Sequence, residues 1–393
     1  MKYKLSDICE YAKEKIKISD LDENTYISTK NMLPNKSGIT QAASLPTQEQ
    51  TQAFMKNDVL VSNIRPYFKK IWFATFDGGC SNDVLVFRAK NGINSRFLHY
   101  VLSDDSFFDY SMATSKGTKM PRGDKKAIME YEVPKLSYEE QSKIASILEV
   151  IDEKIELNSS INKNLEQQAR SLFKAWFVDF EPFGGIQPSE MQFIPLQELC
   201  KVVTKGTTPT TLGKSFTSTG INFIKAESIL DNHSIDSSKF AFIDEETNAL
   251  LKRSVIKAND IVFTIAGTLG RFAMVDNSVL PANTNQAVAI IRPDETKVTP
   301  AYLYSFFIGN WHNEYYSKRI QQAVQANLSL TTIKSLPIAV LKNTTMNNYD
   351  KLVSPLFALM KSNEEENRRL SKLRDTLLPR LMSGELDVSN LDL

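Results

Sequence analysis

The fold of this chain is decided by the stretch Tyr138-Glu-Glu-Gln-Ser-Lys-Ile-Ala-Ser-Ile-Leu148-Glu-Val-Ile-Asp-Glu-Lys-Ile155. Its apolar residues are spaced alternately four and three apart, which is the heptad pattern of a helix with one narrow apolar stripe. The stripe consists of Ile144, Leu148, Ile151, Ile155, Asn158, Asn162, Leu165, Ala169, Leu172 and Trp176. Such a stripe needs a second helix to cover it.

The same spacing recurs 205 residues later in the chain. The second stripe consists of Tyr349, Val353, Leu356, Met360, Asn363, Asn367, Leu370, Arg374, Leu377 and Leu381, and only Arg374 departs from the pattern. The two stripes predict two long helices that cover each other as a coiled coil. A helix of about 35 to 40 residues is a rod of about 50 to 60 Å.

Two asparagines interrupt each stripe at matching positions. In an antiparallel pair aligned centre to centre, Asn158 faces Asn367 and Asn162 faces Asn363. Asparagine at a stripe position costs stability but fixes the register, because a slip leaves its amide against an apolar side chain. We therefore expect an antiparallel coiled coil with these four residues setting its register. The alternative, four exposed polar residues on unrelated helices, requires a coincidence at both positions in both copies.

The repeat extends beyond the helices. Leu5-Ser-Asp-Ile-Cys9 corresponds to Leu196-Gln-Glu-Leu-Cys200, and Val84-Leu-Val-Phe-Arg88 corresponds to Val288-Ala-Ile-Ile-Arg292. A helix is expected after Ser95 in the first half, and after the cap Thr299 and Pro300 in the second. Short strands mixed with one or two helices predict an α+β module in each half.

These patterns divide the chain into segments. Glu181-Pro-Phe-Gly-Gly-Ile-Gln-Pro188 is a turn-rich linker between the halves. Pro355 predicts a kink or a late start of the second helix, and Pro379 predicts its end. The expected segments are a first module at 1–136, a helix at 137–180, a second module at 181–341, a second helix at 342–386 and a tail at 387–393.

Composition limits the classes of function. The formal net charge is only +1, so any surface for nucleic acid must be local. The start of the chain has no apolar signal region, and no run of 18 apolar residues follows, so neither secretion nor membrane insertion is indicated. Cys9, Cys80 and Cys200 are isolated, which fits a reducing cytoplasm better than a disulfide framework or a zinc site.

Basic, amide and hydroxyl side chains gather on loops at equivalent points of both halves. Arg and Lys hold phosphates, and Arg, Lys, Asn, Gln, Ser and Thr match base edges. The candidates in the first half are Lys30, Arg65, Lys69, Lys116, Thr118, Lys119 and Arg122. Those in the second half are Lys205, Lys225, Thr268, Arg271, Gln322, Gln325 and Asn327. The alternative for each one is a solvated surface group.

No catalytic or metal-binding pattern is found. Asn63-Ile-Arg-Pro-Tyr67 lacks the paired prolines of an adenine methyltransferase, and Ala266-Gly-Thr-Leu-Gly270 suits a tight turn better than a phosphate cradle. His99, His233 and His312 are too far apart in the sequence to indicate a metal site. We therefore expect a protein that is not an enzyme and that holds no cofactor or metal.

Three stretches resemble the helical regions of the specificity subunit of Type I restriction-modification systems. They are Glu140-Gln-Ser-Lys-Ile-Ala-Ser-Ile-Leu148, Leu172-Phe-Lys-Ala-Trp-Phe-Val-Asp-Phe-Glu-Pro-Phe183 and Leu377-Leu-Pro-Arg-Leu-Met-Ser-Gly-Glu-Leu386. The module-helix-module-helix layout extends the resemblance to the whole chain. The sequence departs from the pattern where Asn343 to Asn348 replaces the Glu-Gln signature seen at Glu140.

The resemblance implies two target recognition domains, each reading one half of a bipartite sequence in double-stranded DNA. It also implies that the paired helices act as a ruler and dock two methyltransferase subunits, through which restriction and translocase subunits join. S-adenosylmethionine is then expected on the methyltransferase subunits. One alternative is a coiled-coil scaffold that binds proteins without reading DNA. Another, intrinsic methyl transfer, predicts that the isolated chain binds S-adenosylmethionine, which we do not expect.

Overall fold

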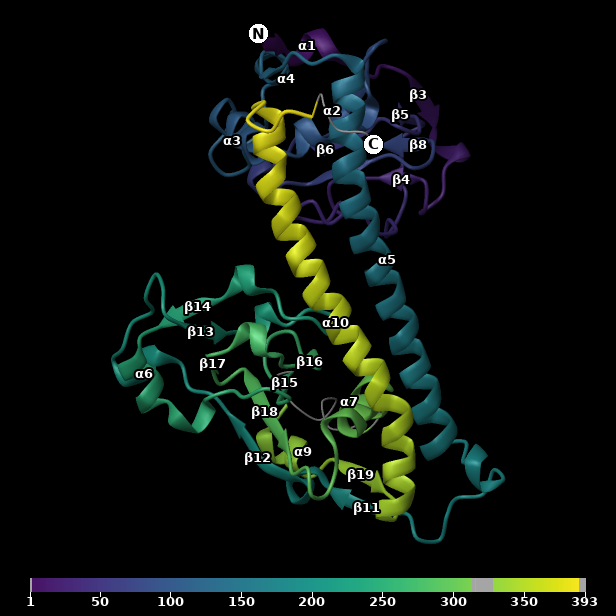
Figure 1. Ribbon diagram of the computed structural model, residues 1–393, viewed down its shortest axis with the longest axis vertical. Coiled ribbons are helices and arrows are strands. Elements are labelled where there is room, and N and C mark those ends of the chain that lie inside the picture. Colours follow the sequence, from purple (N-terminus) through teal and green to yellow (C-terminus); the bar gives the residue numbers. More distant parts are fainter. Residues whose placement is uncertain (1, 313–314, 316–327, 389–393) are drawn as a thin grey trace. The chain divides into compact units, whose positions relative to one another are not determined.

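The computed structural model describes residues 2–312, 315 and 328–388, and the chain forms two units (Figure 1). Unit 1 comprises Met1–Leu157 and Glu366–Leu393, and unit 2 comprises Asn158–Glu365. Each unit contains one mixed module and about half of each long helix. The α+β fold predicted from the sequence is confirmed.

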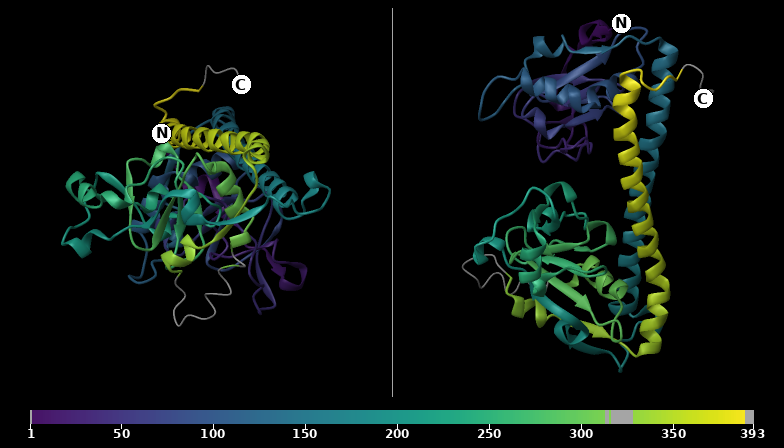
Figure 2. Two further views of the ribbon diagram at one scale, coloured as in Figure 1. Left: turned by 90° about the horizontal axis from the view of Figure 1, so that it is seen from below. Right: turned by 60° about the vertical axis from the view of Figure 1, so that its left-hand side comes forward.

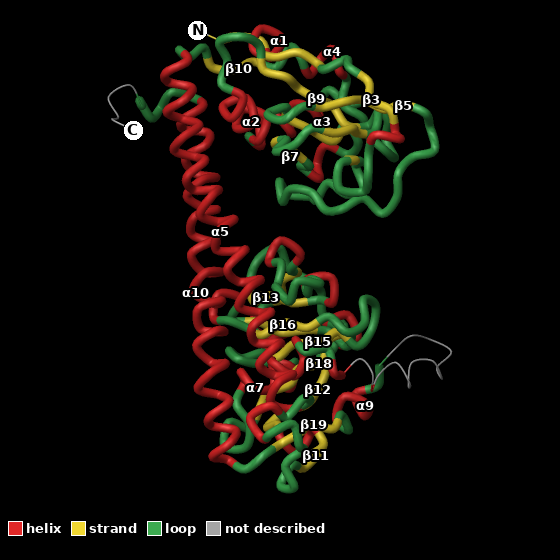
Figure 3. Tube along the Cα trace, turned by 90° about the vertical axis from the view of Figure 1, so that its right-hand side faces the viewer, coloured by secondary structure: helices red, strands yellow, loops and turns green. Residues whose placement is uncertain are grey.

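Both long helices form. Helix α5 spans Tyr138–Phe177 and helix α10 spans Asn343–Met382, and both are continuous in Figure 3. Of the two outcomes predicted for Pro355, a kink or a late start of α10, the late start is wrong, because the helix begins at Asn343 and runs through Pro355 without a break. The buried side chains of Val353 and Phe357 anchor the helix on both sides of that proline, so packing outweighs a local cost of about 3 kcal/mol. The end of α10 just beyond Pro379 agrees with the prediction.

The helices pair antiparallel within each unit, as predicted (Figure 2). In unit 1, Arg374 of α10 donates to Asp152 of α5 at 2.9 Å, and Asn367 donates to the carbonyl of Ile155 at 3.4 Å. Residue numbers therefore rise along α5 as they fall along α10. In unit 2, the same order runs from the contact of Asn162 with Asn363 to that of Phe177 with Tyr349. The Asn162–Asn363 hydrogen bond is 2.8 Å long, and the ring centroids of Phe177 and Tyr349 are 5.0 Å apart.

The module of unit 1 is built on two four-stranded sheets. The first has the order β2-β9-β6-β7 and is antiparallel throughout. Its strands are Cys9–Tyr11 (β2), Val84–Ala89 (β9), Val59–Ser62 (β6) and Ile71–Phe73 (β7). The second sheet consists of Lys15–Lys17 (β3), Gln50–Phe54 (β5), Gly78–Cys80 (β8) and Tyr26–Ile27 (β4).

Short elements complete unit 1. Strands β1 (Lys2–Lys4) and β10 (Glu132–Pro134) pair antiparallel. The remaining α-helices are α1 (Leu5–Ile8), α2 (Ser95–Ser103), α3 (Asp105–Ala113) and α4 (Lys125–Ile128). Asn94 caps α2, since its side chain accepts from the Phe97 backbone N–H, so the helix begins one residue earlier than predicted.

The module of unit 2 repeats the first sheet in the order β12-β18-β15-β16. Its strands are Cys200–Lys205 (β12), Val288–Pro293 (β18), Ile261–Thr264 (β15) and Phe272–Met274 (β16). A three-stranded sheet consists of Ala241–Ile243 (β14), Ile221–Ile224 (β13) and Ala282–Thr284 (β17), and β11 (Gln192–Pro195) pairs with β19 (Pro337–Val340). The short α-helices among the described residues of this module are α6 (Glu245–Leu250), α7 (Pro300–Ile308) and α9 (Leu330–Lys334). Thr299 caps α7 with Pro300 at its first position, as predicted.

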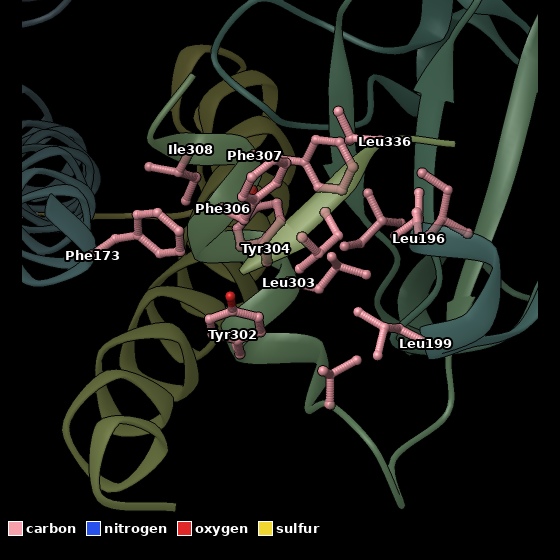
Figure 4. Close-up of a cluster of buried hydrophobic side chains, with 14 of the residues drawn as sticks. Phe173, Leu196, Leu199, Tyr302, Leu303, Tyr304, Phe306, Phe307, Ile308 and Leu336 are labelled. Carbon is pink, nitrogen blue, oxygen red and sulfur yellow. The ribbon is translucent and has the colours of Figure 1, made fainter. Parts of the chain in front are cut away.

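Aromatic side chains join the second module to the long helices inside unit 2 (Figure 4). Tyr302 and Phe306 of α7 lie beside Phe173 of α5, with ring centroids 6.0 and 5.9 Å away. Tyr302 also contacts Tyr349 of α10 at 5.9 Å. Burying each ring contributes about 1.5–3 kcal/mol, so α7 holds this module firmly on the helix pair.

The same buried ion pair occurs in both modules. Arg88 of β9 binds both carboxylate oxygens of Asp58 at 2.9 and 2.7 Å, and Arg292 of β18 binds both oxygens of Asp260 at 2.7 Å. The two aspartate side chains are only 3% and 0% exposed. The pair links the start of β6 or β15, the strand that precedes the loop, to the neighbouring inner strand β9 or β18.

Candidate nucleic-acid interface

Two loops that are far apart in the sequence meet in unit 1. The first loop, residues 63–70, follows β6, and the second, residues 114–124, follows α3. The Arg65 backbone N–H donates to the carbonyl of Pro121 at 2.8 Å, and Gly123 donates to the carbonyl of Asn63 at 3.2 Å. An isolated bridge joins Ile64 to Arg122. The fold therefore brings together most of the basic residues predicted in the first half.

The second loop presents its tip to solvent. Lys116 and Arg122 exchange backbone hydrogen bonds of 2.9 and 3.0 Å, so the residues between them form a small closed loop. Gly117 at its start has a φ of +92°, a conformation that favours glycine. Thr118 and Lys119 lie at the exposed tip, where they can reach a ligand without rearrangement of the backbone.

Ion pairs arrange the charges of this loop. Lys116, whose side chain is 81% exposed, binds Asp124 at 2.6 Å, and Arg122 binds Asp83 at 3.1 Å. The Lys116 side-chain hydrogen bond, followed by the backbone N–H groups of Ala127 and Lys126, lowers the pKa of Asp124 to about 2. Exposed ion pairs stabilise a fold by about 0–1 kcal/mol. Both cations can therefore exchange a carboxylate for a phosphate at little cost.

Lys69 and Lys30 border the same surface. Lys69 binds Asp105 of α3 at 2.9 Å, and Lys36, which the sequence analysis did not single out, binds the other oxygen at 2.8 Å. Lys30 is exposed in the turn after β4, and the neighbouring carbonyl of Thr29 accepts from the Lys70 side chain at 2.6 Å. All seven candidates of the first half thus lie on, or directly beside, the two joined loops.

The candidates of the second half are more dispersed. Arg271 binds both oxygens of Asp231 at 2.6 Å, so its guanidinium holds a neighbouring loop. Lys225 binds Glu227 at 2.6 Å, Lys205 is exposed at the end of β12, and Thr268 is exposed. Gln322, Gln325 and Asn327 lie outside the described residues. The second module nevertheless has an equivalent junction. The Leu328 backbone N–H donates to the carbonyl of Ile265 at 2.9 Å, at the position where the loops of unit 1 also join.

The asparagines of the helix pair are engaged in hydrogen bonds. Asn363 donates to Asn162 at 2.8 Å, and Asn162 donates to the carbonyl of Met360 at 3.0 Å. The facing of Asn158 and Asn367 stays a prediction, as does the role of all four in setting the register. Arg374, the residue that breaks the apolar stripe, is neutralised by Asp152, which also accepts from the Tyr100 hydroxyl at 2.9 Å.

The part of the chain that the structure describes contains neither a candidate metal site nor a candidate membrane-spanning helix. No group of His, Cys, Asp and Glu among residues 2–312, 315 and 328–388 has an arrangement that could hold a metal ion. No helix within those ranges is both long and apolar enough to cross a membrane.

Comparisons with known proteins agree on one family. The family described as the Type I restriction modification DNA specificity domain matches residues 1–167 and 188–342. The chain is 26% identical to the Type I restriction enzyme HindI specificity subunit of Haemophilus influenzae, over 98% of this chain and 99% of that protein. It is 27% identical to the MjaIX specificity subunit of Methanocaldococcus jannaschii, over 77% of this chain and 71% of that protein.

A solved structure has the same fold. The crystal structure of a Type I restriction-modification S subunit from M. genitalium superposes with a TM-score of 0.57 at 17% sequence identity. The match covers 97% of this chain and 96% of that chain.

Proposed function

Because the chain belongs to the family of the Type I restriction modification DNA specificity domain, we propose that it recognises a two-part DNA sequence and positions methyltransferase subunits on it. Specificity subunits of these systems are not catalytic, and the catalytic activities reside on other subunits. Two parts of this proposal go beyond membership of the family: the target has two parts, and the paired helices position the methyltransferase subunits.

The observation that carries the proposal is the joining of loops 63–70 and 114–124 in unit 1. Their backbone hydrogen bonds bring Arg65 and Lys69 of the first loop next to the loop that carries Lys116, Thr118, Lys119 and Arg122. Lys and Arg are suited to successive phosphates, and a threonine hydroxyl is suited to a base edge.

The repeat supports a target with two halves. Each module has the same sheet order and the same junction between a loop after the third strand and a later segment of its module. One module would read one half-site, and the paired helices would set a separation comparable to one or two helical turns of about 34 Å. We further propose that two methyltransferase subunits dock on these helices, with restriction and translocase subunits joined through them.

S-adenosylmethionine belongs to the methyltransferase subunits in this proposal, because the sequence lacks the base-holding and cofactor motifs of an adenine methyltransferase. The chain would work in the cytoplasm, where the double-stranded DNA that it reads is found.

A methylome experiment tests the proposal directly. DNA from a host that expresses this chain with the methyltransferase subunits of its system should carry a two-part adenine-methylated motif that is missing without the chain. A continuous motif, or no new motif, would contradict the proposal.

The alternative is a coiled-coil scaffold that does not read DNA, and a salt titration separates the two. The complex with its methyltransferase subunits should bind a duplex with an affinity that falls steeply with salt, because each neutralised phosphate contributes about 0.9 to the logarithmic slope. The variant Lys116→Gln/Lys119→Gln should lower the slope, whereas Lys2→Gln, on strand β1, should not. No salt dependence, with or without partner subunits, would favour the scaffold.

A further inference from the structure

Two aromatic side chains are exposed side by side on loop 63–70 of unit 1. Tyr67 is 49% exposed and Phe68 is 38% exposed, and their ring centroids are 4.7 Å apart. Rings of this size are normally covered in a soluble protein, since their burial is favourable. Two neighbouring exposed rings therefore indicate a surface that meets a partner.

The backbone beneath the rings is fixed in an unusual conformation. Arg65 and Lys69, which flank the short turn of Pro66–Phe68, have φ angles of +50° and +48°, in the left-handed region that residues other than glycine rarely adopt. Such strain persists only where the surroundings enforce it, and it concentrates at functional sites.

Three tethers hold this turn from different sides. The Asn35 backbone N–H donates to the carbonyl of Phe68 at 2.8 Å, and the Arg65 N–H donates to the carbonyl of Pro121 at 2.8 Å. The Lys69 side chain binds Asp105 of α3 at 2.9 Å. These contacts fix the backbone that carries the two rings, so less conformational entropy is lost when the rings bind a partner.

The loop that adjoins the aromatic pair is basic. The tether to Pro121 joins this turn to the loop that carries Lys116, Lys119 and Arg122, whose tip also exposes Met120 at 46%. An apolar wedge set within cations complements a base-pair step, in which apolar base faces lie between two lines of phosphates. Lys116 and Arg122 can exchange Asp124 and Asp83 for the phosphates on either side of such a step.

We propose that Tyr67 and Phe68 insert as a wedge at one base-pair step of the half-site read by unit 1 and partly unstack it. This inference rests on the proposed function, since it assumes that loops 63–70 and 114–124 contact DNA. It adds recognition through DNA deformability, in which steps that unstack easily are favoured at a position without hydrogen-bonded readout.

The second module supplies an internal control. Its equivalent loop, residues 264–271, contains Gly267 and Gly270 at φ angles of +79° and +83° and no aromatic residue. The wedge is therefore expected in one half-site only. A distortion confined to one side of the two-part motif would be its signature.

The experiment uses the full chain in complex with its methyltransferase subunits and a duplex that contains the methylated motif. The probe is 2-aminopurine, placed at successive positions of each half-site, because its fluorescence rises when it is unstacked. Outside the methylated adenine of each half-site, binding should raise the emission several-fold at one step of the half-site of unit 1 and at no step of the other half-site.

Variants assign the distortion to the two rings. Tyr67→Ala/Phe68→Ala should abolish the rise at that step and weaken duplex binding by about 5-fold to 100-fold, as for other aromatic side chains that stack on bases. The salt slope should stay unchanged, since no cation is removed. Phe193→Ala removes an aromatic side chain of β11 that is 62% exposed, and it should change none of these quantities.

The failure of this inference differs from that of the proposed function. Specific duplex binding without a fluorescence rise, or a rise that persists in the double variant, would overturn the wedge and leave the proposed function standing. A double variant that loses its methyltransferase subunits while its DNA distortion persists would show that the rings bind protein instead, which also overturns the wedge. No sequence-specific binding at all would overturn both.

Discussion

At the residue scale, the structure places a few charged and polar groups where solvent does not reach. Asp58 and Asp260, each bound through two contacts by Arg88 or Arg292, are buried at equivalent points of the two modules. A buried pair adds little net stability compared with apolar residues, but the loss of one partner leaves an uncompensated charge. These pairs therefore constrain the position of the basic loops that follow β6 and β15.

The first prediction concerns the pair in unit 2. Asp260→Ala should lower the free energy of unfolding by about 3–5 kcal/mol, because it removes a fully buried carboxylate and leaves the two donors of Arg292 that face it without an acceptor. Urea denaturation followed by circular dichroism measures the change. Asp231→Ala is the matched control, since Asp231 also binds an arginine through two contacts but is 80% exposed, and its loss should cost no more than about 1 kcal/mol. Equal effects would contradict the argument.

The second prediction concerns pH. Burial, followed by the nearby charge of His233, lowers the pKa of His312 from 6.5 to about 3. The unfolded chain therefore binds a proton at this site below about pH 6.5 that the folded chain does not. The free energy of unfolding should therefore fall as the pH decreases from about 6.5 towards 3, by about 1.4 kcal/mol per pH unit for this residue.

Urea midpoints at pH 7 and pH 5 measure this dependence. His312 lies among the rings of Phe263, Phe272 and Phe307, with centroids 5.2–5.7 Å away, so His312→Leu keeps the site apolar. The variant should lose less stability than the wild type between the two pH values. An unchanged difference would assign the acid sensitivity to other groups.

At the element scale, the sequence predicts what repeats over many residues. The heptad spacing extends over ten positions of each helix, and it is sufficient to predict both helices, whereas the antiparallel pairing is predicted from the matching asparagines. The single residue Pro355 is a weaker guide, because its local cost is smaller than the packing of its buried neighbours. Within unit 2, the hydrogen bond between Asn162 and Asn363 adds a polar contact that an apolar stripe alone would not specify.

The third prediction tests that contact. Asn363→Leu should destabilise unit 2 by about 1–3 kcal/mol, because the Asn162 oxygen loses its donor in a partly buried position. Asn162→Leu/Asn363→Leu should restore the stability or exceed it, since neither amide then lacks a partner. Thermal melts of the two variants beside the wild type give the comparison. A double variant that is less stable than the single one would show that the amides stabilise the pair.

The fourth prediction tests the ruler. One heptad inserted into each helix lengthens the pair by about 10 Å, which corresponds to roughly 3 base pairs of B-DNA. The methylated motif should keep both half-sites and gain a spacer that is longer by about that amount. A heptad inserted into α5 alone should destabilise the protein instead, because the partner stripe is then too short. An unchanged spacer after the paired insertion would refute the ruler.

At the scale of the whole molecule, the units show why the candidate site was only partly predictable. Sequence pattern predicts that basic residues lie on loops at equivalent positions of a repeat. It does not predict that loop 63–70 is hydrogen-bonded to Pro121, or that Arg271 is held by Asp231, because these contacts join residues tens of positions apart. Tyr67 ends the stretch Asn63-Ile-Arg-Pro-Tyr67, but only the structure shows that its ring and the ring of Phe68 are exposed.

The fifth prediction concerns the two modules. Replacing residues 181–341 with the same module of a relative that has a different target should change one half of the methylated motif and leave the other half unaltered. Methylome sequencing reads both halves at once. Changes in both halves would mean that each module contributes to the whole target.

The boundary of unit 2 falls inside the two long helices, at Asn158 and Glu365. One uninterrupted stretch of gene therefore encodes the entire unit, and both of its ends lie in stretches that share the same heptad spacing. Two crossovers within those stretches would exchange the whole of unit 2, and both long helices would remain continuous. Under the proposed function, one such exchange would replace the whole surface that reads a half-site, without a series of point changes in the loops.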